Sequence, residues 1–181
     1  MRKVAGVLLT AAMVLPVGLL AAPAGAVGGT SCKTASGSAT FTPALPKLSS
    51  KTMVVSTVKS TGAKIGGCVG GGVKSATASI TAKFSKPGNC TTLATAKTAN
   101  PTKGTGTWTW DNKKTSTISL TLTGGTGATA THAKLAGTVT AGMFKGSKLS
   151  GSVIYAIPSG ACKTTALSKV TFKQLTPLVI K

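Results

Sequence analysis

Few side chains in this 181-residue sequence can do acid–base or nucleophilic chemistry. The chain has a single acidic residue, Asp111, and a single histidine, His132. One carboxylate cannot form the carboxyl pair of a glycoside hydrolase or a calcium or magnesium site built on several carboxylates. A Ser-His-Asp triad would need Asp111 and His132 to meet a serine, and no G-x-S-x-G motif is present. The sequence therefore predicts a protein that is not an enzyme, with His132 at a strand edge or surface and Asp111 in a turn.

The four cysteines can form disulfides or bind a metal. They are Cys32, Cys68, Cys90 and Cys162, and three pairings are possible. We expect the pairs Cys32–Cys68 and Cys90–Cys162, which close one loop in each half of the chain. A metal site is the rival interpretation, but no pair has C-x2-C spacing and only His132 could assist. We therefore predict two disulfides, no metal and no cofactor.

The aromatic residues are the remaining candidates for binding chemistry, and Trp108 and Trp110 lie in the stretch Gly104–Leu122. This stretch alternates large apolar with small polar residues, which predicts a β-hairpin with two distinct faces. A three-residue loop, Asn112–Lys114, places Trp108 opposite Ile118 and makes the tryptophans core. A two-residue loop shifts the register by one and exposes the tryptophans as a platform for sugars or flat ligands. The first register is favoured, because a buried apolar face specifies register.

The elements that would position these residues are short strands. A second hairpin is expected from Leu135–Met143 and Leu149–Ile157, which contains Tyr155, around a turn at Phe144–Lys148. A short strand, Thr40–Thr42, is expected to stop at Pro43. The glycine cluster Gly66–Gly72 lacks the spacing of a nucleotide-binding loop and predicts a tight turn or bulge beside Cys68.

The first 26 residues have the features of a signal peptide. A charged start is followed by the apolar run Val4–Leu20 and by the small-residue sequence Ala24–Ala26. We expect removal of residues 1–26, with an uncleaved membrane anchor as the alternative. Residues 27–181 then form one domain with no further membrane span, secreted to the extracellular space or held at the cell wall.

The charge is strongly positive and comes almost entirely from lysine. The formal net charge of the whole chain is +20, and it falls to +18 when Arg2 and Lys3 are removed. The remaining lysines are spread from Lys33 to Lys181, as expected for a solvated surface that attracts polyanions in a salt-dependent way. No arginine remains and no stacking aromatics are laid out for base recognition, so sequence-specific nucleic-acid binding is not expected.

Four motifs carry a resemblance to known proteins: the cysteine near the mature N-terminus, G-N-C-T-T-L at Gly88–Leu93, G-T-W-T-W at Gly106–Trp110, and F-K-G-S-K-L-S-G at Phe144–Gly151. On these motifs the chain resembles small, largely uncharacterised secreted β-proteins of high-GC Gram-positive bacteria. It is more loosely similar to the neocarzinostatin-like apoproteins, which are two-disulfide immunoglobulin-like sandwiches that carry a small chromophore. Those proteins are typically acidic and shorter, and the resemblance brings no functional residue to this chain.

Taken together, Thr, Ser, Gly and Val dominate, and strands recur with Gly/Pro turns between them. This pattern predicts an all-β, immunoglobulin-like antiparallel sandwich of about 8–9 strands with a core of small residues. We expect a non-enzymatic exported protein held by its lysines at the anionic cell envelope or at other extracellular polyanions. The alternative is a small-molecule or glycan-binding module that uses Trp108, Trp110 and Tyr155. The oligomeric state does not follow from the sequence.

Overall fold

The computed structural model describes residues 28–90, 101–124 and 131–181. The predicted signal peptide, residues 1–26, lies outside the described residues. The described chain forms eight antiparallel strands in sequence order: β1 Thr30–Leu45, β2 Thr57–Val69, β3 Ala76–Phe84, β4 Thr102–Trp110, β5 Thr115–Gly124, β6 His132–Gly142, β7 Lys148–Ala156 and β8 Leu167–Ile180.

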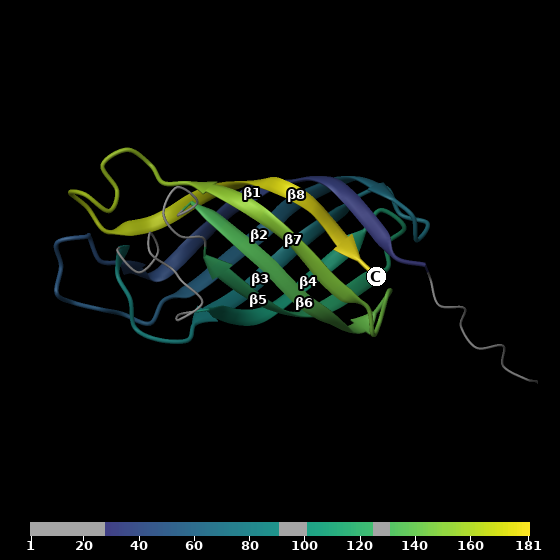
Figure 1. Ribbon diagram of the computed structural model, residues 1–181, viewed down its shortest axis with the longest axis horizontal. Helices are drawn as coiled ribbons and strands as arrows, with labels where there is room; N and C mark the ends of the chain where they lie inside the picture. The colour runs from purple at the N-terminus through teal and green to yellow at the C-terminus, as the bar shows by residue number, and fades with distance from the viewer. Residues whose placement is uncertain (1–27, 91–100, 125–130) are drawn as a thin grey trace, which may run out of the picture.

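The eight strands close into a barrel in which each strand pairs with its neighbours in sequence and β8 pairs with β1 (Figure 1). The prediction of an all-β antiparallel domain is confirmed. The prediction of an immunoglobulin-like sandwich is wrong, although the eight described strands agree with the predicted number of about 8–9. Both architectures bury alternate residues of each strand, so the alternation that predicts strands does not distinguish two stacked sheets from one closed sheet.

Irregularities in the two terminal strands accompany closure. The β1–β8 ladder shifts register between Cys32 and Ser36 and again between Thr40 and Leu45. Such bulges bend a strand and increase its twist, which a closed barrel requires. The second shift lets β1 continue past Pro43, where a strand end was predicted, because a residue without an N–H is tolerated where the ladder is already interrupted.

The β4–β5 hairpin has the predicted faces but not the predicted register. Trp108 lies opposite Ser116, not Ile118, and the loop residues are Asp111, Asn112 and Lys113. The loop is one residue earlier than expected, because Lys113 adopts the left-handed conformation (φ 66°) and lets the Trp110 N–H reach the Lys114 carbonyl at 2.9 Å. Because the pairing shifts by two residues and not by one, the tryptophans stay inside the barrel. The alternative prediction, in which a two-residue loop exposes the tryptophans as a binding platform, is therefore wrong.

Both predicted disulfides are present. Cys32–Cys68 joins β1 to β2 at a directly paired position, and Cys90–Cys162 joins the β3–β4 connection to the β7–β8 connection. Gly70, Gly71 and Gly72 of the glycine cluster form the predicted turn after Cys68, whereas Gly66 and Gly67 lie within β2. At Gly71 (φ 62°) a Cβ atom would lie 2.5 Å from the Phe144 ring, so only glycine fits.

The β6–β7 hairpin is confirmed, but its turn contributes to the core. Phe144, expected in the turn, is 4% exposed and folds back into the barrel. Its ring lies edge-on to that of Trp110, with a centroid separation of 5.2 Å. We call this end of the barrel, where β2–β3, β4–β5 and β6–β7 are joined, the tryptophan end; the opposite end, which contains Tyr155 and the Cys90–Cys162 disulfide, is the tyrosine end.

Candidate functional site: a cavity in the barrel interior

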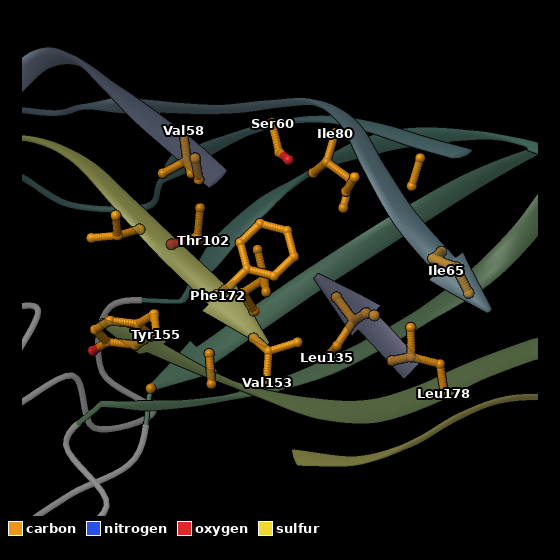
Figure 2. Close-up of a pocket in the computed structure, with 18 of the residues that line it drawn as sticks. Val58, Ser60, Ile65, Ile80, Thr102, Leu135, Val153, Tyr155, Phe172 and Leu178 are labelled. Carbon is orange, nitrogen blue, oxygen red and sulfur yellow. The ribbon is translucent and has the colours of Figure 1, made fainter. Parts of the chain in front are cut away.

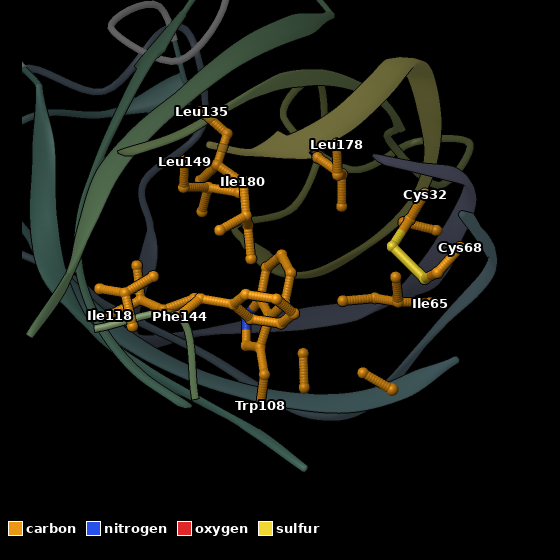
Figure 3. Close-up of a cluster of buried hydrophobic side chains, with 14 of the residues drawn as sticks. Cys32, Ile65, Cys68, Trp108, Ile118, Leu135, Phe144, Leu149, Leu178 and Ile180 are labelled. Atoms are coloured by element: carbon orange, nitrogen blue, oxygen red, sulfur yellow. A yellow bond between two sulfur atoms is a disulfide. The ribbon is translucent and has the colours of Figure 1, made fainter. Parts of the chain in front are cut away.

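The barrel interior is packed as two clusters of buried side chains. One occupies the tryptophan end and includes Trp108, Trp110 and Phe144 (Figure 3). The other occupies the tyrosine end and includes Phe41, Phe84 and Tyr155. Phe172 packs against both clusters. Where the two clusters meet, the side chains leave a cavity of about 150 Å³ (Figure 2).

The cavity follows from the small side chains that face inward on one side of the barrel. β1, β2 and β3 contribute only alanine or serine at five of the inward positions that line it: Ala35, Ala39, Ser60, Ala63 and Ala78. An eight-stranded barrel is just wide enough for ordinary side chains to fill it. Larger residues complete the lining, among them Leu135, Val153 and, on the same three strands, Phe41, and a space remains between them.

The cavity lining is almost entirely carbon and has no charged side chain among the described residues. Its polar side chains come from Ser60, Thr102, Trp108 and Tyr155. Ser60 is 4% exposed and Trp108 is 1% exposed. Within the described ranges, neither the Ser60 Oγ nor the Trp108 Nε1 has a hydrogen-bond partner. Leaving a buried polar atom unpaired costs about 1–3 kcal/mol, so these two atoms are the polar groups most in need of a partner.

Ser60 reaches this position because β2 is irregular beside it. The β2–β3 ladder shifts register between Ser60 and Ala63, and Gly62 within the shift has a φ of 71°. The shift allows both Ser60 and Ala63 to be buried although three positions separate them, which regular alternation would not allow. The hydroxyl is therefore placed inside the barrel by the backbone, and its position among the cavity side chains is visible in Figure 2.

Trp110 has a different environment from Trp108. Its Nε1 donates to the Ser116 Oγ at 2.8 Å, and the Ser116 hydroxyl donates to the Met143 carbonyl at 2.6 Å. The Trp110 ring packs against Trp108 and Phe144 and does not line the cavity. Trp110 therefore closes the tryptophan end and has its polar atom satisfied, which makes it structural.

Tyr155 lines the cavity from β7, at the tyrosine end. Burial disfavours the charged phenolate and raises the pKa of the Tyr155 hydroxyl from 10.0 to about 12. The group is therefore a neutral phenol at physiological pH. It presents an aromatic ring to the cavity and no charge.

The residues considered for catalysis do not come together. His132 begins β6 at the tyrosine end, whereas Asp111 follows β4 at the tryptophan end. Asp111 lies in a turn as expected, but its carboxylate accepts a hydrogen bond at 3.1 Å from the backbone N–H of Lys74 in the β2–β3 connection and so ties two connections together. In the described part of the chain, no three His, Cys, Asp or Glu residues are grouped to hold a metal.

The lysines all lie on the outer surface in the ranges that the structure describes, where every one of them is exposed. The chain has only one acidic side chain, so the lysines have almost no side-chain counter-charge. As far as the described residues extend, the barrel therefore has an uncharged, largely apolar interior and a cationic exterior.

Two of the three predicted ligand-binding residues, Trp108 and Tyr155, lie at one cavity, and Trp110 does not line it. Ser60 and the cavity itself were missed. The sequence signal for the cavity is the run of small residues at alternating positions, for example Ala76, Ala78 and Ala82. This run predicts a core of small side chains, and small side chains leave the interior of an eight-stranded barrel partly empty.

No protein-family model, curated protein or solved structure that was compared with this chain matches it. Within the described residues, no helix is both long and apolar enough to cross a membrane. The interpretation of the site therefore depends on its geometry and chemistry alone.

Proposed function

We propose that this protein is an exported, non-enzymatic β-barrel that binds a small neutral molecule in its interior. The observation that carries the proposal is the apolar cavity of about 150 Å³, whose lining includes two buried polar side chains, Ser60 and Trp108, that have no hydrogen-bond partner among the described residues. Two disulfides support export, because they form and persist in oxidising compartments.

The cavity limits the size and charge of the ligand. An apolar cavity of about 150 Å³ holds a molecule the size of benzene. A charged ligand is disfavoured, because the lining residues that the structure describes supply no charged partner and burial of an unpaired charge is costly. The ligand class is therefore a neutral molecule with one ring or a short branched chain.

The two unpaired polar atoms suggest one hydrogen-bonding group on the ligand. The Trp108 Nε1–H can only donate, whereas the Ser60 hydroxyl can donate or accept. A ligand hydroxyl or carbonyl would satisfy at least one of them. A net gain of about 0.5–1.5 kcal/mol for a neutral hydrogen bond corresponds to roughly two- to tenfold tighter binding than the purely apolar analogue.

Calorimetric titration of the disulfide-bonded protein with benzene, phenol and benzoate tests this function. We expect phenol to bind more tightly than benzene and benzoate not to bind. Ala78→Leu, which places a larger side chain in the cavity, should abolish binding of both neutral ligands. The matched control Ala136→Leu, on the exposed outer face of β6, should leave binding unchanged. The absence of saturable binding by wild type, or equal binding by Ala78→Leu, would contradict the proposal.

A second function is favoured by the exterior. Exposed lysines cover the described surface, while Asp111 is the only acidic side chain in the chain. Such a surface attracts anionic polymers of the cell envelope, and its attachment weakens as salt rises. Washing producing cells with increasing salt should release the protein progressively, and a protein found free in low-salt medium would contradict retention by charge.

A further inference from the structure

The lysines are not evenly placed around the barrel, and one strand is framed by four of them. On the outer face, Thr40 of β1 pairs with one lysine of β2 and one of β8, and Ser36, four residues earlier and across a register shift in the β1–β2 ladder, does the same. All four lysines are exposed. We call this group the lysine frame, and its members are Lys59, Lys64, Lys169 and Lys173.

The dimensions of the lysine frame follow from sheet geometry. Neighbouring strands lie about 4.8 Å apart, so the two lysine Cα atoms of one row are about 10 Å apart across β1. The rows at Ser36 and Thr40 are four residues apart along β1, which is roughly 13 Å. Hydroxyl side chains form the floor between the lysines, since Ser36, Ser38 and Thr40 lie along β1 within the lysine frame.

The charge of the lysine frame has no acidic side chain nearby to balance it. Asp111, the only one in the chain, lies at the tryptophan end in the turn after β4, where its carboxylate binds the Lys74 backbone N–H of the β2–β3 connection. Four lysines whose Cα atoms are about 10–13 Å apart carry ammonium groups that repel one another weakly at physiological salt, where the screening length is about 8 Å. A series of anionic groups laid along β1 removes this repulsion and makes charge-assisted hydrogen bonds to the lysines and hydroxyls.

We propose that the lysine frame is a docking surface for a linear phosphate polymer that runs along the outer face of β1. A single phosphate is short relative to the roughly 13 Å between rows, so it contacts one row, whereas a chain of phosphates contacts both. Lysine binds phosphate as a point charge without the planar geometry that arginine imposes, which suits a repetitive polymer. This inference deepens the second proposed function, because it assigns the polyanion to one surface.

The test compares two variants of equal net charge. The frame variant replaces its four lysines by glutamine: Lys59→Gln, Lys64→Gln, Lys169→Gln and Lys173→Gln. The control variant replaces four exposed lysines elsewhere on the barrel: Lys83→Gln, Lys103→Gln, Lys134→Gln and Lys148→Gln. Binding of inorganic polyphosphate is measured from 50 to 200 mM salt, with orthophosphate as competitor and circular dichroism to verify folding.

We expect the frame variant to bind polyphosphate at least about 30-fold more weakly than wild type and to lose about 3 units from its log–log salt slope. The control variant should lose less than about one unit of slope. Orthophosphate at equal phosphate concentration should not compete. Equal losses in the two variants would overturn the lysine frame while leaving retention by charge intact. Failure of wild type to bind polyphosphate at all would overturn both.

Discussion

Two buried serines provide matched substitutions with opposite expected effects. Ser60 and Ser116 are both at most 4% exposed. Ser116 accepts from the Trp110 Nε1 and donates to the Met143 carbonyl, whereas the Ser60 Oγ has no partner among the described residues. Replacement by alanine removes the same hydroxyl group in both cases, so the difference in stability reports the environment of that hydroxyl.

Ser60→Ala should stabilise the ligand-free protein. Removing an unpaired buried hydroxyl recovers about 1–3 kcal/mol. The void left by one oxygen atom, about 10–15 Å³, costs on the order of 0.3 kcal/mol at about 24 cal/mol per Å³. The net gain of about 0.7–2.7 kcal/mol corresponds to a rise in Tm of roughly 1–11 °C for a domain of this size.

Ser116→Ala should destabilise the protein by about 1–3 kcal/mol, because it leaves the Trp110 N–H and the Met143 carbonyl buried without a partner. Urea unfolding, with the slope compared between variants, and thermal unfolding by circular dichroism measure both changes. Destabilisation by Ser60→Ala of the same size as that by Ser116→Ala would refute the reasoning, since it would mean that the Ser60 hydroxyl is already satisfied.

Three further predictions concern the interior and the disulfides. Trp108 and Trp110 should emit blue-shifted fluorescence that resists acrylamide, and red-shifted, quenchable emission would contradict their burial. Tyr155, the only tyrosine, should ionise near pH 12 in an absorbance titration. Because its pKa in the folded protein exceeds the unfolded value of 10.0, the stability that depends on the neutral phenol is complete below pH 10 and is lost as the pH rises from 10 to 12. Ionisation of Tyr155 near pH 10 in the folded protein would contradict this prediction. The double variant Cys90→Ala/Cys162→Ala, which opens a loop spanning 72 residues, should lose about 4 kcal/mol of unfolding free energy in urea, and an unchanged midpoint would contradict the predicted contribution.

Alternation of side chains along the strands could be predicted from the sequence with little error. The β4–β5 hairpin illustrates both the success and its limit. The apolar pattern predicts correctly that the tryptophans and Ile118 face the same side of the hairpin, because a shift of the pairing by one residue would expose every large side chain. The choice between registers that differ by two does not follow, because both bury the same face and the turn conformation at Lys113 decides between them.

Closure of the barrel could not be predicted from local pattern. It depends on pairing between β1 and β8, which lie at opposite ends of the described chain, and on the bulges that bend both strands. The Cys32–Cys68 and Cys90–Cys162 pairs, which were predicted, do not distinguish the two folds, because each is compatible with a sandwich or a barrel.

The binding residues were only partly predictable for the same reason. Trp108, Trp110 and Tyr155 were chosen by residue type, but only the barrel geometry shows that Trp108 and Tyr155 line the cavity while Trp110 closes one end. Ser60 resembles any other serine in a Thr/Ser-rich chain. Its burial results from the register shift beside Gly62, which the alternation pattern alone would not predict.

A crystal of the mature protein soaked with iodobenzene tests the central claim most directly, because anomalous scattering locates the iodine without prior assumptions. We predict a strong peak inside the barrel between Ser60 and Trp108, and its loss in crystals of Ala78→Leu. Iodine peaks confined to the outer surface of the barrel, or an interior peak that persists in Ala78→Leu, would contradict the account.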